Sequence, residues 1–277
     1  MRVVTYESGR GPRAGLIRGD SVVDAWDALG GGGATVRELL ASGRLAELED
    51  AGGDETPLAR VKLHPPVPDP EKIIGIGLNY TDHAAEARLD PPPSPTFFAK
   101  FANALRADGA TVALPAASQK VDYEAEVALI VGRRARDVSE AEAIDHLAGY
   151  TLLNDLSARD LQFATPQWMP GKVFDGSAPC GPAIVTPDEA GPADAIGIAL
   201  DLNGERMQED TTAGLIFSIP RLVAHLSSLM TLEPGDIVST GTPAGVGGAR
   251  DPSVWLRPGD EVVVSSPQLG RLTTTIA

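Results

Sequence analysis

From residue 73 to residue 266 the sequence is a succession of short apolar runs that end at Gly, Pro or Asp. Runs of this length, bounded by turn-forming residues, are typical of β-strands. Eight runs predict strands, at 73–80, 111–115, 123–132, 148–155, 183–187, 198–205, 235–241 and 261–266. Because few helical segments separate them, the pattern favours a β-rich α+β fold, closer to a mixed β-sandwich roll than to a parallel sheet wound with helices.

Two helices are predicted between these strands. Residues 139–147 begin with Ser139 and Glu142 at the spacing of a capping box. Residues 219–230 repeat apolar side chains at helical spacing. Two Pro-Gly-Asp triplets, at 234–236 and 258–260, each precede a predicted strand, and Pro followed by Gly favours a type II turn.

The first sixty-odd residues have a pattern of their own. Strands are predicted at 3–8 and 14–26, followed by a helical segment at 35–52. The segment 64–72 carries four prolines, which disfavour both a helix and a central strand, so it is interpreted as a linker. We therefore predict a small N-terminal α+β domain at 1–68 and a larger β-rich domain at 69–277.

The charge of the chain excludes several partners. Its 23 Lys and Arg stand against 38 Asp and Glu, a formal net charge of −15. Nucleic acids and anionic membrane surfaces are bound through basic residues, so neither is expected here. An anionic small molecule can still be bound if a metal ion reverses the local field. With one cysteine, no disulfide and no long apolar run, a cytoplasmic location is expected.

The most informative segment is 121–131, VDYEAEVALIV. Alternation in a strand places Asp122, Glu124 and Glu126 on one face and apolar residues on the other. Like charges at this spacing repel one another unless solvent or a cation separates them. The acidic face is therefore either a solvated surface or part of a metal site.

Asp155 supplies a third carboxylate, just after the predicted strand at 148–155. Alone it is interpreted most simply as a helix N-cap. Taken with Glu124 and Glu126 it completes a set of three carboxylates without His or Cys. Such a set suits a hard divalent cation, Mg²⁺ or Mn²⁺, with positions left open for water and substrate oxygens.

His83 and Glu86 are three residues apart and share one face of any helix formed at 77–88. The pair is either a chance surface contact or a general-base pair in which the carboxylate orients the imidazole ring. The sequence DPPPSP follows at once, so the helix is expected to be short and to act as a mobile lid.

Other candidate residues carry weaker signals. Lys172 lies in a loop of small residues and is either solvated or the group that holds an anionic substrate or oxyanion. Cys180 is expected to be a buried apolar residue rather than a nucleophile. The Gly-rich stretch 241–248 lacks the Lys of a P-loop, and Gly75 and Gly77 do not complete a dinucleotide fingerprint. His64, His146 and His225 are assigned no chemistry.

Seven strings in this order, GLNYTDHAAEA, TFFAK, DYEAEVALIVG, GYTLLNDLSARDLQ, GKVFDGSAPCGP, LNGERMQ and PGDIVSTGTPAGVG, resemble the fumarylacetoacetate hydrolase superfamily. The resemblance implies a mixed β-sandwich roll, usually dimeric, that binds Mg²⁺ or Mn²⁺ through Glu124, Glu126 and Asp155. It also implies a lid on which His83 and Glu86 activate water.

The resemblance implies further roles around this centre. Lys172 matches a lysine that stabilises oxyanions. Gln162 and Thr242 match residues that contact substrate oxygens, and Lys100 is expected to contact substrate. Lys100 is followed by FANAL, where related chains more often have Pro and small hydroxyl residues.

The predicted function is metal-dependent hydrolysis of a carbon–carbon bond in an acylpyruvate or similar β-diketo acid, with a small anionic 2-oxo acid as substrate. If the lid keeps water away, the same chemistry supports decarboxylation of an oxaloacetate-like acid or isomerisation of an unsaturated oxo diacid. A metal-stabilised binding protein without catalysis is the non-enzymatic alternative.

Overall fold

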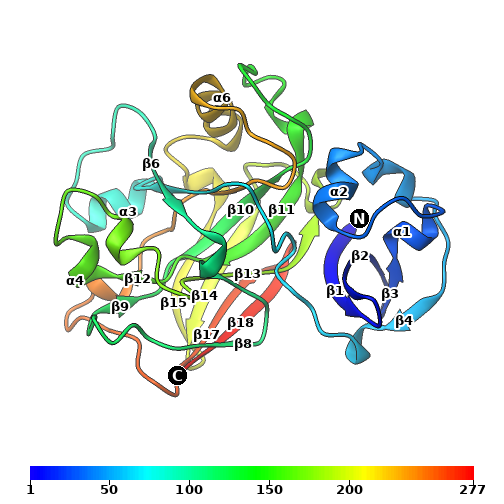
Figure 1. Cartoon of the computed structure of the whole chain (residues 1–277). Coiled ribbons are helices and arrows are strands. Elements are labelled where there is room, and N and C mark those ends of the chain that lie inside the picture. Colours follow the sequence, from blue (N-terminus) through cyan, green and yellow to red (C-terminus); the bar gives the residue numbers. More distant parts are fainter.

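The computed structural model describes all 277 residues, and strands dominate it (Figure 1). The strands are β1 (Arg2–Ser8), β2 (Gly11–Arg18), β3 (Ser21–Asp24), β4 (Glu55–Pro57), β5 (Ile73–Gly77), β6 (Thr96–Lys100), β7 (Leu105–Arg106), β8 (Ala110–Val112), β9 (Val121–Asp122), β10 (Ala125–Val131), β11 (Leu147–Asn154), β12 (Ser157–Ala158), β13 (Ala178–Val185), β14 (Gly197–Leu202), β15 (Glu205–Thr211), β16 (Ile237–Ser239), β17 (Glu261–Ser266) and β18 (Gly270–Ile276). The predicted β-rich α+β class is confirmed.

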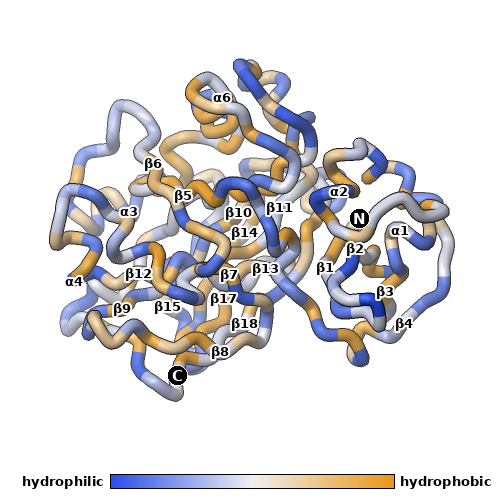
Figure 2. The backbone as a smooth tube through the Cα atoms, viewed as in Figure 1, coloured by the Kyte–Doolittle hydropathy of each residue, from blue (hydrophilic) through white to orange (hydrophobic).

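The strands form three sheets. The largest has the order β4-β3-β2-β1-β13-β11-β10-β16-β5-β6, with β7 beside β13, and it mixes parallel and antiparallel pairs. A five-stranded sheet has the order β15-β14-β17-β18-β8, and β9 pairs with β12. The main apolar core includes residues from both larger sheets, and the strand interiors are the hydrophobic parts of the trace in Figure 2.

Strand β10 lies at the centre of this arrangement. Val127 and Leu129 belong to the main core, whereas Ala128 and Ile130 belong to a second core that includes residues of the N-terminal helices. Successive side chains of a strand point to opposite faces, so β10 is covered on both sides. It is therefore a rigid support for whatever its N-terminal end carries.

The N-terminal residues extend the large sheet, because β1 pairs with β13 through Arg2–Val185 and Val3–Ile184. The predicted strand 14–26 is instead the hairpin β2–β3, which turns at Gly19 with a positive φ of 55°. Residues 64–72 contain no helix or strand, as their prolines predict. The division into 1–68 and 69–277 stays a prediction.

Helices are few and short. They are α1 (Ala25–Ala28), α2 (Val36–Ala41), α3 (Thr81–Glu86), α4 (Arg159–Gln162), α5 (Pro187–Ala190) and α6 (Ile219–Leu229), with 3₁₀ turns η1 (Leu45–Leu48), η2 (Leu58–Arg60), η3 (Ala102–Ala104), η4 (Ala143–His146), η5 (Met169–Gly171), η6 (Thr212–Gly214) and η7 (Gly247–Ala249). The helix predicted at 219–230 is confirmed by α6. None of the helices combines the length and the apolar character that a membrane crossing requires.

The helix predicted at 139–147 is wrong, because only the turn η4 forms there. Only half of the capping box forms: the Glu142 side chain accepts from the backbone N–H of Ser139, but the Glu142 N–H donates to the Ser139 backbone carbonyl rather than to its hydroxyl. Leu147 already pairs with Val131 as the first residue of β11, so strand pairing ends the segment before an α-helix can develop.

The predicted strand 121–131 is broken between β9 and β10. The carboxylate of Asp122 accepts from the N–H of Tyr123, and the N–H of Glu124 donates to the side chain of Asn154 at 3.1 Å. Side-chain acceptors thus replace the backbone ladder at this point. The break lies where the acidic residues face the interior of the molecule.

Candidate metal centre and catalytic cavity

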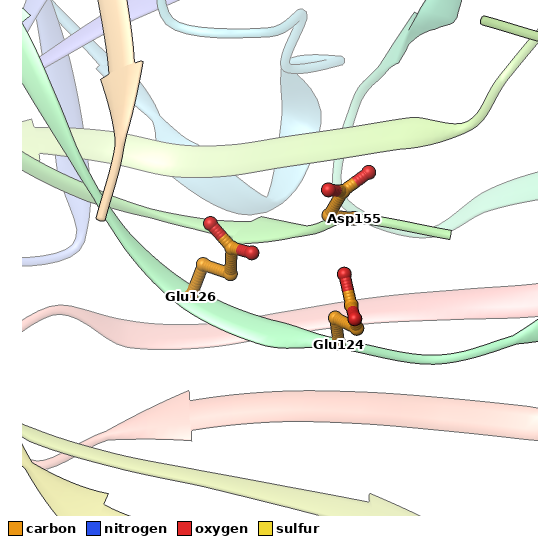
Figure 3. A group of neighbouring side chains, drawn as sticks. All are labelled: Glu124, Glu126 and Asp155. Atoms are coloured by element: carbon orange, nitrogen blue, oxygen red, sulfur yellow. The ribbon is translucent and has the colours of Figure 1, made fainter. Parts of the chain in front are cut away.

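Glu124, Glu126 and Asp155 gather at one end of β10 (Figure 3). Ligand oxygens of the three carboxylates lie within 4.8 Å of one another, and all three residues are buried. Glu124 and Glu126 share a face because they are two residues apart in extended backbone. Asp155 joins them because β11 runs antiparallel to β10 and the N–H of Asp155 donates to the carbonyl of Glu124 at 2.9 Å.

Two sequence-based alternatives are therefore excluded. The acidic face is not solvated, since Asp122 and Glu126 are at most 2% exposed. Asp155 is not a helix N-cap, because the next helix, α4, is capped at Ala158.

Three cations, Lys100, Arg159 and Lys172, contact these carboxylates. The Lys172 ammonium lies 2.6 Å from Glu124 Oε2 and 2.8 Å from Asp155 Oδ2. The Arg159 guanidinium lies 2.8 Å from Glu124 Oε1. Lys172 is 2% exposed, so the solvated-loop alternative for it is wrong. Burial lowers the pKa of Lys172, but Asp155 and Glu124 outweigh this effect and raise it above the ordinary value.

Glu126 differs from its neighbours because no cation contacts it. Its Oε2 accepts from the Ser239 hydroxyl and from the N–H of Gly241. Burial, followed by repulsion from Asp155 and Glu124, raises the pKa of Glu126 to about 8. Glu124 is equally buried, yet Arg159 and Lys172 hold its pKa well below the usual range.

Together with Asp122, which also contacts Arg159, the cluster has four buried carboxylates against three cations, and Glu126 is the carboxylate that no cation contacts. Three buried carboxylates are the oxygen donors that Mg²⁺ and Mn²⁺ prefer. The residues present therefore fit a divalent cation, and the raised pKa of Glu126 shows that its ionised form has no compensating positive charge.

His83 and Glu86 lie on the short helix α3, as predicted. His83 Nδ1 is 3.1 Å from Glu86 Oε2, and Glu86 Oε1 accepts from the N–H of Gly245 at 3.0 Å. Burial raises the pKa of Glu86, but the hydrogen bonds from His83 and Gly245 leave it below the ordinary value. The Glu86 carboxylate thus holds Nδ1 of the His83 imidazole ring in place.

The Gly-rich stretch 241–248 has a role that the sequence analysis missed. Its backbone N–H groups donate to three different carboxylates, Glu126 from Gly241, Glu86 from Gly245, and Asp122 from Gly247 and Gly248. Successive amides of a loop can form an anion-binding concavity. Here the anions are the side chains of the site itself.

A cavity of about 850 Å³ joins these groups. Its lining includes seven of the predicted site residues, namely His83, Glu86, Glu124, Glu126, Gln162, Lys172 and Thr242. The side-chain carbonyl of Gln162 accepts a hydrogen bond from Arg159 at 3.0 Å. The Thr242 hydroxyl donates to the backbone carbonyl of Ala125 at 2.9 Å.

Neither Lys100 nor Asp155 is among the residues that line the cavity, and the contact of Lys100 with substrate stays a prediction. Its ammonium donates to Asp155 Oδ1 at 2.6 Å and to the backbone carbonyl of Lys172. Burial lowers its pKa, and the lysine lies behind Asp155. The residue supports the carboxylate cluster from the protein side.

Arg159 is the functional residue that sequence reasoning overlooked. It lies 2.9 Å from Asp122 and 2.8 Å from Glu124 and thereby ties the two acidic residues together. The signal was available, since a third buried carboxylate on the acidic strand requires a cation. Cys180 is buried as predicted, and burial raises the pKa of its thiol to about 12.

Comparison with known proteins matches this chain to one family. The family model of the fumarylacetoacetate hydrolase C-terminal domain matches residues 72–277. The mitochondrial oxaloacetate tautomerase of Xenopus laevis is 36% identical over 289 residues, which cover 100% of this chain and 90% of that protein.

Solved structures of other proteins resemble this chain over its whole length. The 5-carboxymethyl-2-hydroxymuconate delta-isomerase of Mycobacterium smegmatis has a TM-score of 0.82 at 32% identity, covering 100% of this chain and 98% of that one. The maleylpyruvate hydrolase of Sphingobium sp. SYK-6, solved with manganese(II) and pyruvate, has a TM-score of 0.84 at 31% identity, covering 100% and 99%.

Proposed function

The chain belongs to the fumarylacetoacetate hydrolase family, and we propose that it is a divalent-metal-dependent enzyme that enolises 2-oxo acids by moving a proton at the carbon next to the oxo group. The observation that carries the proposal is the meeting of three kinds of group in one cavity. These are a carboxylate cluster with a surplus negative charge, a buried ammonium and a His–Glu pair.

Glu124, Glu126 and Asp155 would hold the cation. Bound there, Mg²⁺ or Mn²⁺ would supply Lewis-acid stabilisation of negative charge on substrate oxygens. The cation would also reverse the local field of a protein with a net charge of −15, which is what an anionic substrate requires.

The protein groups divide the remaining work. The Lys172 ammonium stabilises the negative charge that develops on the 2-oxo oxygen. When the Nδ1–H of His83 donates a hydrogen bond to Glu86, Nε2 carries a lone pair. This lone pair can accept the substrate proton, which His83 then returns to another position. Gln162 and Thr242 orient the substrate oxygens, and α3 covers the site from water.

The names of the relatives support proton movement as the common step. A tautomerase and an isomerase both move a proton without breaking a carbon–carbon bond. We also propose the homodimer and the cytoplasmic location expected from the sequence, the first of which sedimentation of the purified protein tests.

Hydrolysis of an acylpyruvate is the second candidate, favoured by the same His–Glu pair and by the likeness to a maleylpyruvate hydrolase. In that reaction His83 activates water, which adds to the distal carbonyl, and the carbon–carbon bond breaks to give a carboxylic acid and pyruvate. Decarboxylation differs from both by releasing CO₂.

One experiment separates these reactions. The purified protein is incubated with Mn²⁺ in D₂O, and exchange of C3 protons of pyruvate is followed by NMR. Release of pyruvate from acetylpyruvate and release of CO₂ from oxaloacetate are measured in parallel. We expect metal-dependent C3 exchange that His83→Ala slows by about 10²–10⁴-fold.

The alternatives predict different results. Pyruvate release from acetylpyruvate at a rate equal to C3 exchange would select hydrolysis, and CO₂ release at that rate would select decarboxylation. Wild-type protein that binds Mn²⁺ without accelerating any of the three reactions would identify a binding protein and contradict the proposal.

A further inference from the structure

The wall of the cavity beyond the carboxylate cluster is aromatic. Only 5% of the residues in this chain are Phe, Trp or Tyr. Four of them, Phe98, Phe163, Trp168 and Trp255, nevertheless line this one cavity, and they include two of the three tryptophans. Such a concentration of large apolar side chains at a cavity is typical of a binding surface for an apolar group.

Two glycines of β5 hold part of this wall in place. A Cβ on Gly75 would lie 2.4 Å from the Phe98 ring, and a Cβ on Gly77 would lie 2.1 Å from the Trp168 ring. The two rings meet edge to face, with centroids 6.1 Å apart. Glycine weakens a strand interior, so its presence at both positions serves the close approach of the rings.

The aromatic wall begins directly beside the reactive groups. The Lys172 ammonium lies 4.9 Å from the centroid of the Phe98 ring, in the range of a cation–π contact. The part of a bound substrate that extends away from the metal centre therefore lies against Phe98 and then Trp168.

The charges of the cavity do not favour a second carboxylate on the substrate. Arg159 is held by Asp122 and Glu124, and the proposed function assigns Lys172 to the 2-oxo oxygen at the metal end, so neither cation is free for a second carboxylate. Lys120 is the one lining cation with no carboxylate partner, and it is exposed. A carboxylate buried against apolar rings without a cation carries a large desolvation cost.

The size of the cavity agrees with a substrate longer than a four-carbon acid. Its volume of about 850 Å³ is in the range of cavities that hold drug-sized ligands. At its rim Leu89 and Phe163 are 58% and 68% exposed, although both are large apolar residues. Exposed apolar side chains that line a cavity are a mark of a ligand-binding site.

We propose that the cavity selects 2-oxo acids whose distal end is an apolar ring, as in an arylpyruvate, over 2-oxo diacids. This inference rests on the proposed function, because the carboxylate and the oxo group of the substrate are assigned to the metal end. Trp168 and Phe163 are then residues that determine specificity through contact with the ring.

A matched series of acids tests the proposal. Phenylpyruvate, pyruvate and oxaloacetate carry a ring, a hydrogen and a carboxylate, respectively, at C3. With saturating Mn²⁺, C3 exchange in D₂O is measured for each acid and the uncatalysed rate is subtracted. We expect kcat/KM for phenylpyruvate to exceed both others by at least about tenfold.

Variants locate the origin of this preference. Trp168→Ala is expected to lower the phenylpyruvate-to-pyruvate ratio about tenfold, Trp168→Phe to restore most of it, and Phe163→Ala to lower it about threefold. Phe101→Ala is the matched control, since Phe101 is an exposed aromatic residue that does not line the cavity. Its ratio should equal that of the wild type. Phe163 is exposed, so its variant tests the inference even if Trp168→Ala does not fold.

Failure of the inference and failure of the proposed function give different results. A preference for oxaloacetate that Lys120→Gln abolishes would overturn the inference and leave enolisation in place. Absence of exchange with all three acids would contradict the proposed function. In that case the binding of each acid to the Mn²⁺-loaded protein is measured by calorimetry. The inference requires phenylpyruvate to bind at least about tenfold more tightly than pyruvate, and equal affinities would overturn it.

Discussion

Two clusters of carboxylates and cations lie in different parts of this molecule, and they differ in charge balance. In the N-terminal part, Asp24 and Asp27 face Arg10 and Arg13, two charges against two. Around the cavity there are four carboxylates against three cations, and the members are Asp122, Glu124, Glu126 and Asp155 with Lys100, Arg159 and Lys172.

The two clusters affect their carboxylates in opposite ways. Burial raises the pKa of Asp24, but the bonds from Arg13, the α1 backbone and Tyr6 leave it below the ordinary value. Glu126 has no cation, and its pKa is raised to about 8. A balanced cluster needs nothing further and stabilises the fold. A cluster with one surplus buried carboxylate favours the protonated form of that group, and a cation that joins the cluster allows it to ionise.

Replacement of Glu126 should have the largest effect. Glu126→Gln keeps the shape of the side chain but removes the charge that attracts the cation. We expect Mn²⁺ binding to be lost and C3 exchange to fall at least about 1,000-fold. Unfolding without metal above about pH 8 should show a stability equal to or above that of the wild type, because at that pH the variant lacks a disfavoured buried charge. A strongly destabilised variant would mean that Glu126 is a structural residue.

Replacement of Lys172 distinguishes substrate stabilisation from metal binding within the same cluster. Lys172→Met should lower kcat about 10²–10³-fold, because the ammonium near the substrate oxygen is lost. Mn²⁺ affinity, measured by calorimetry, should rise, since a cation that competes for Glu124 and Asp155 has been removed. Weaker Mn²⁺ binding in a folded variant would contradict this assignment.

Replacement of a carboxylate in the N-terminal cluster should lower the stability of the protein and leave C3 exchange unchanged. Asp24→Asn leaves the buried Arg13 guanidinium with weaker partners, and we expect a loss of about 2–3 kcal/mol in the free energy of unfolding in urea. C3 exchange by the folded variant should be unchanged. The exposed pair Arg44–Glu47 is the control, and Glu47→Gln should change neither stability nor exchange measurably.

The smallest expected effect is on the pH dependence of stability without metal. The pKa of Glu126 rises from an ordinary 4.5 to about 8 in the folded protein, so the folded state binds a proton that the unfolded state releases. This contribution to stability is full below about 4.5 and is lost as the pH rises through about 8. The wild type in chelator should therefore lose a few degrees of Tm relative to Glu126→Gln between these limits. A constant difference would contradict the raised pKa.

The sequence predicted what depends on local pattern. Alternation along 121–131 identified the acidic face, and helical periodicity identified α6. The three carboxylates were grouped as a candidate metal site from their residue types, and the family resemblance supported the same grouping. The pairing of β10 with β11 then brings Asp155 beside Glu124.

The parts that sequence reasoning missed depend on partners distant in the chain. Asp122 and Arg159 are 37 residues apart, and β1 joins β13 across more than 170 residues. The failed helix at 139–147 formed only half of its capping box, and strand pairing of Leu147 prevailed over local preference. Lys100 was assigned to the substrate from the family resemblance, and its contacts with Asp155 and the carbonyl of Lys172, 55 and 72 residues away, leave no mark in the local sequence.

Calorimetric titration of the metal-free protein with Mn²⁺, repeated in the presence of oxalate, tests the central claim most directly. Oxalate presents two adjacent oxygens of the kind that a 2-oxo acid offers to a cation. We expect one Mn²⁺ per chain, tighter binding with oxalate, and no binding by Glu126→Gln. A folded wild-type protein without saturable Mn²⁺ binding would show that the surplus carboxylate is not a cation site and would contradict the account.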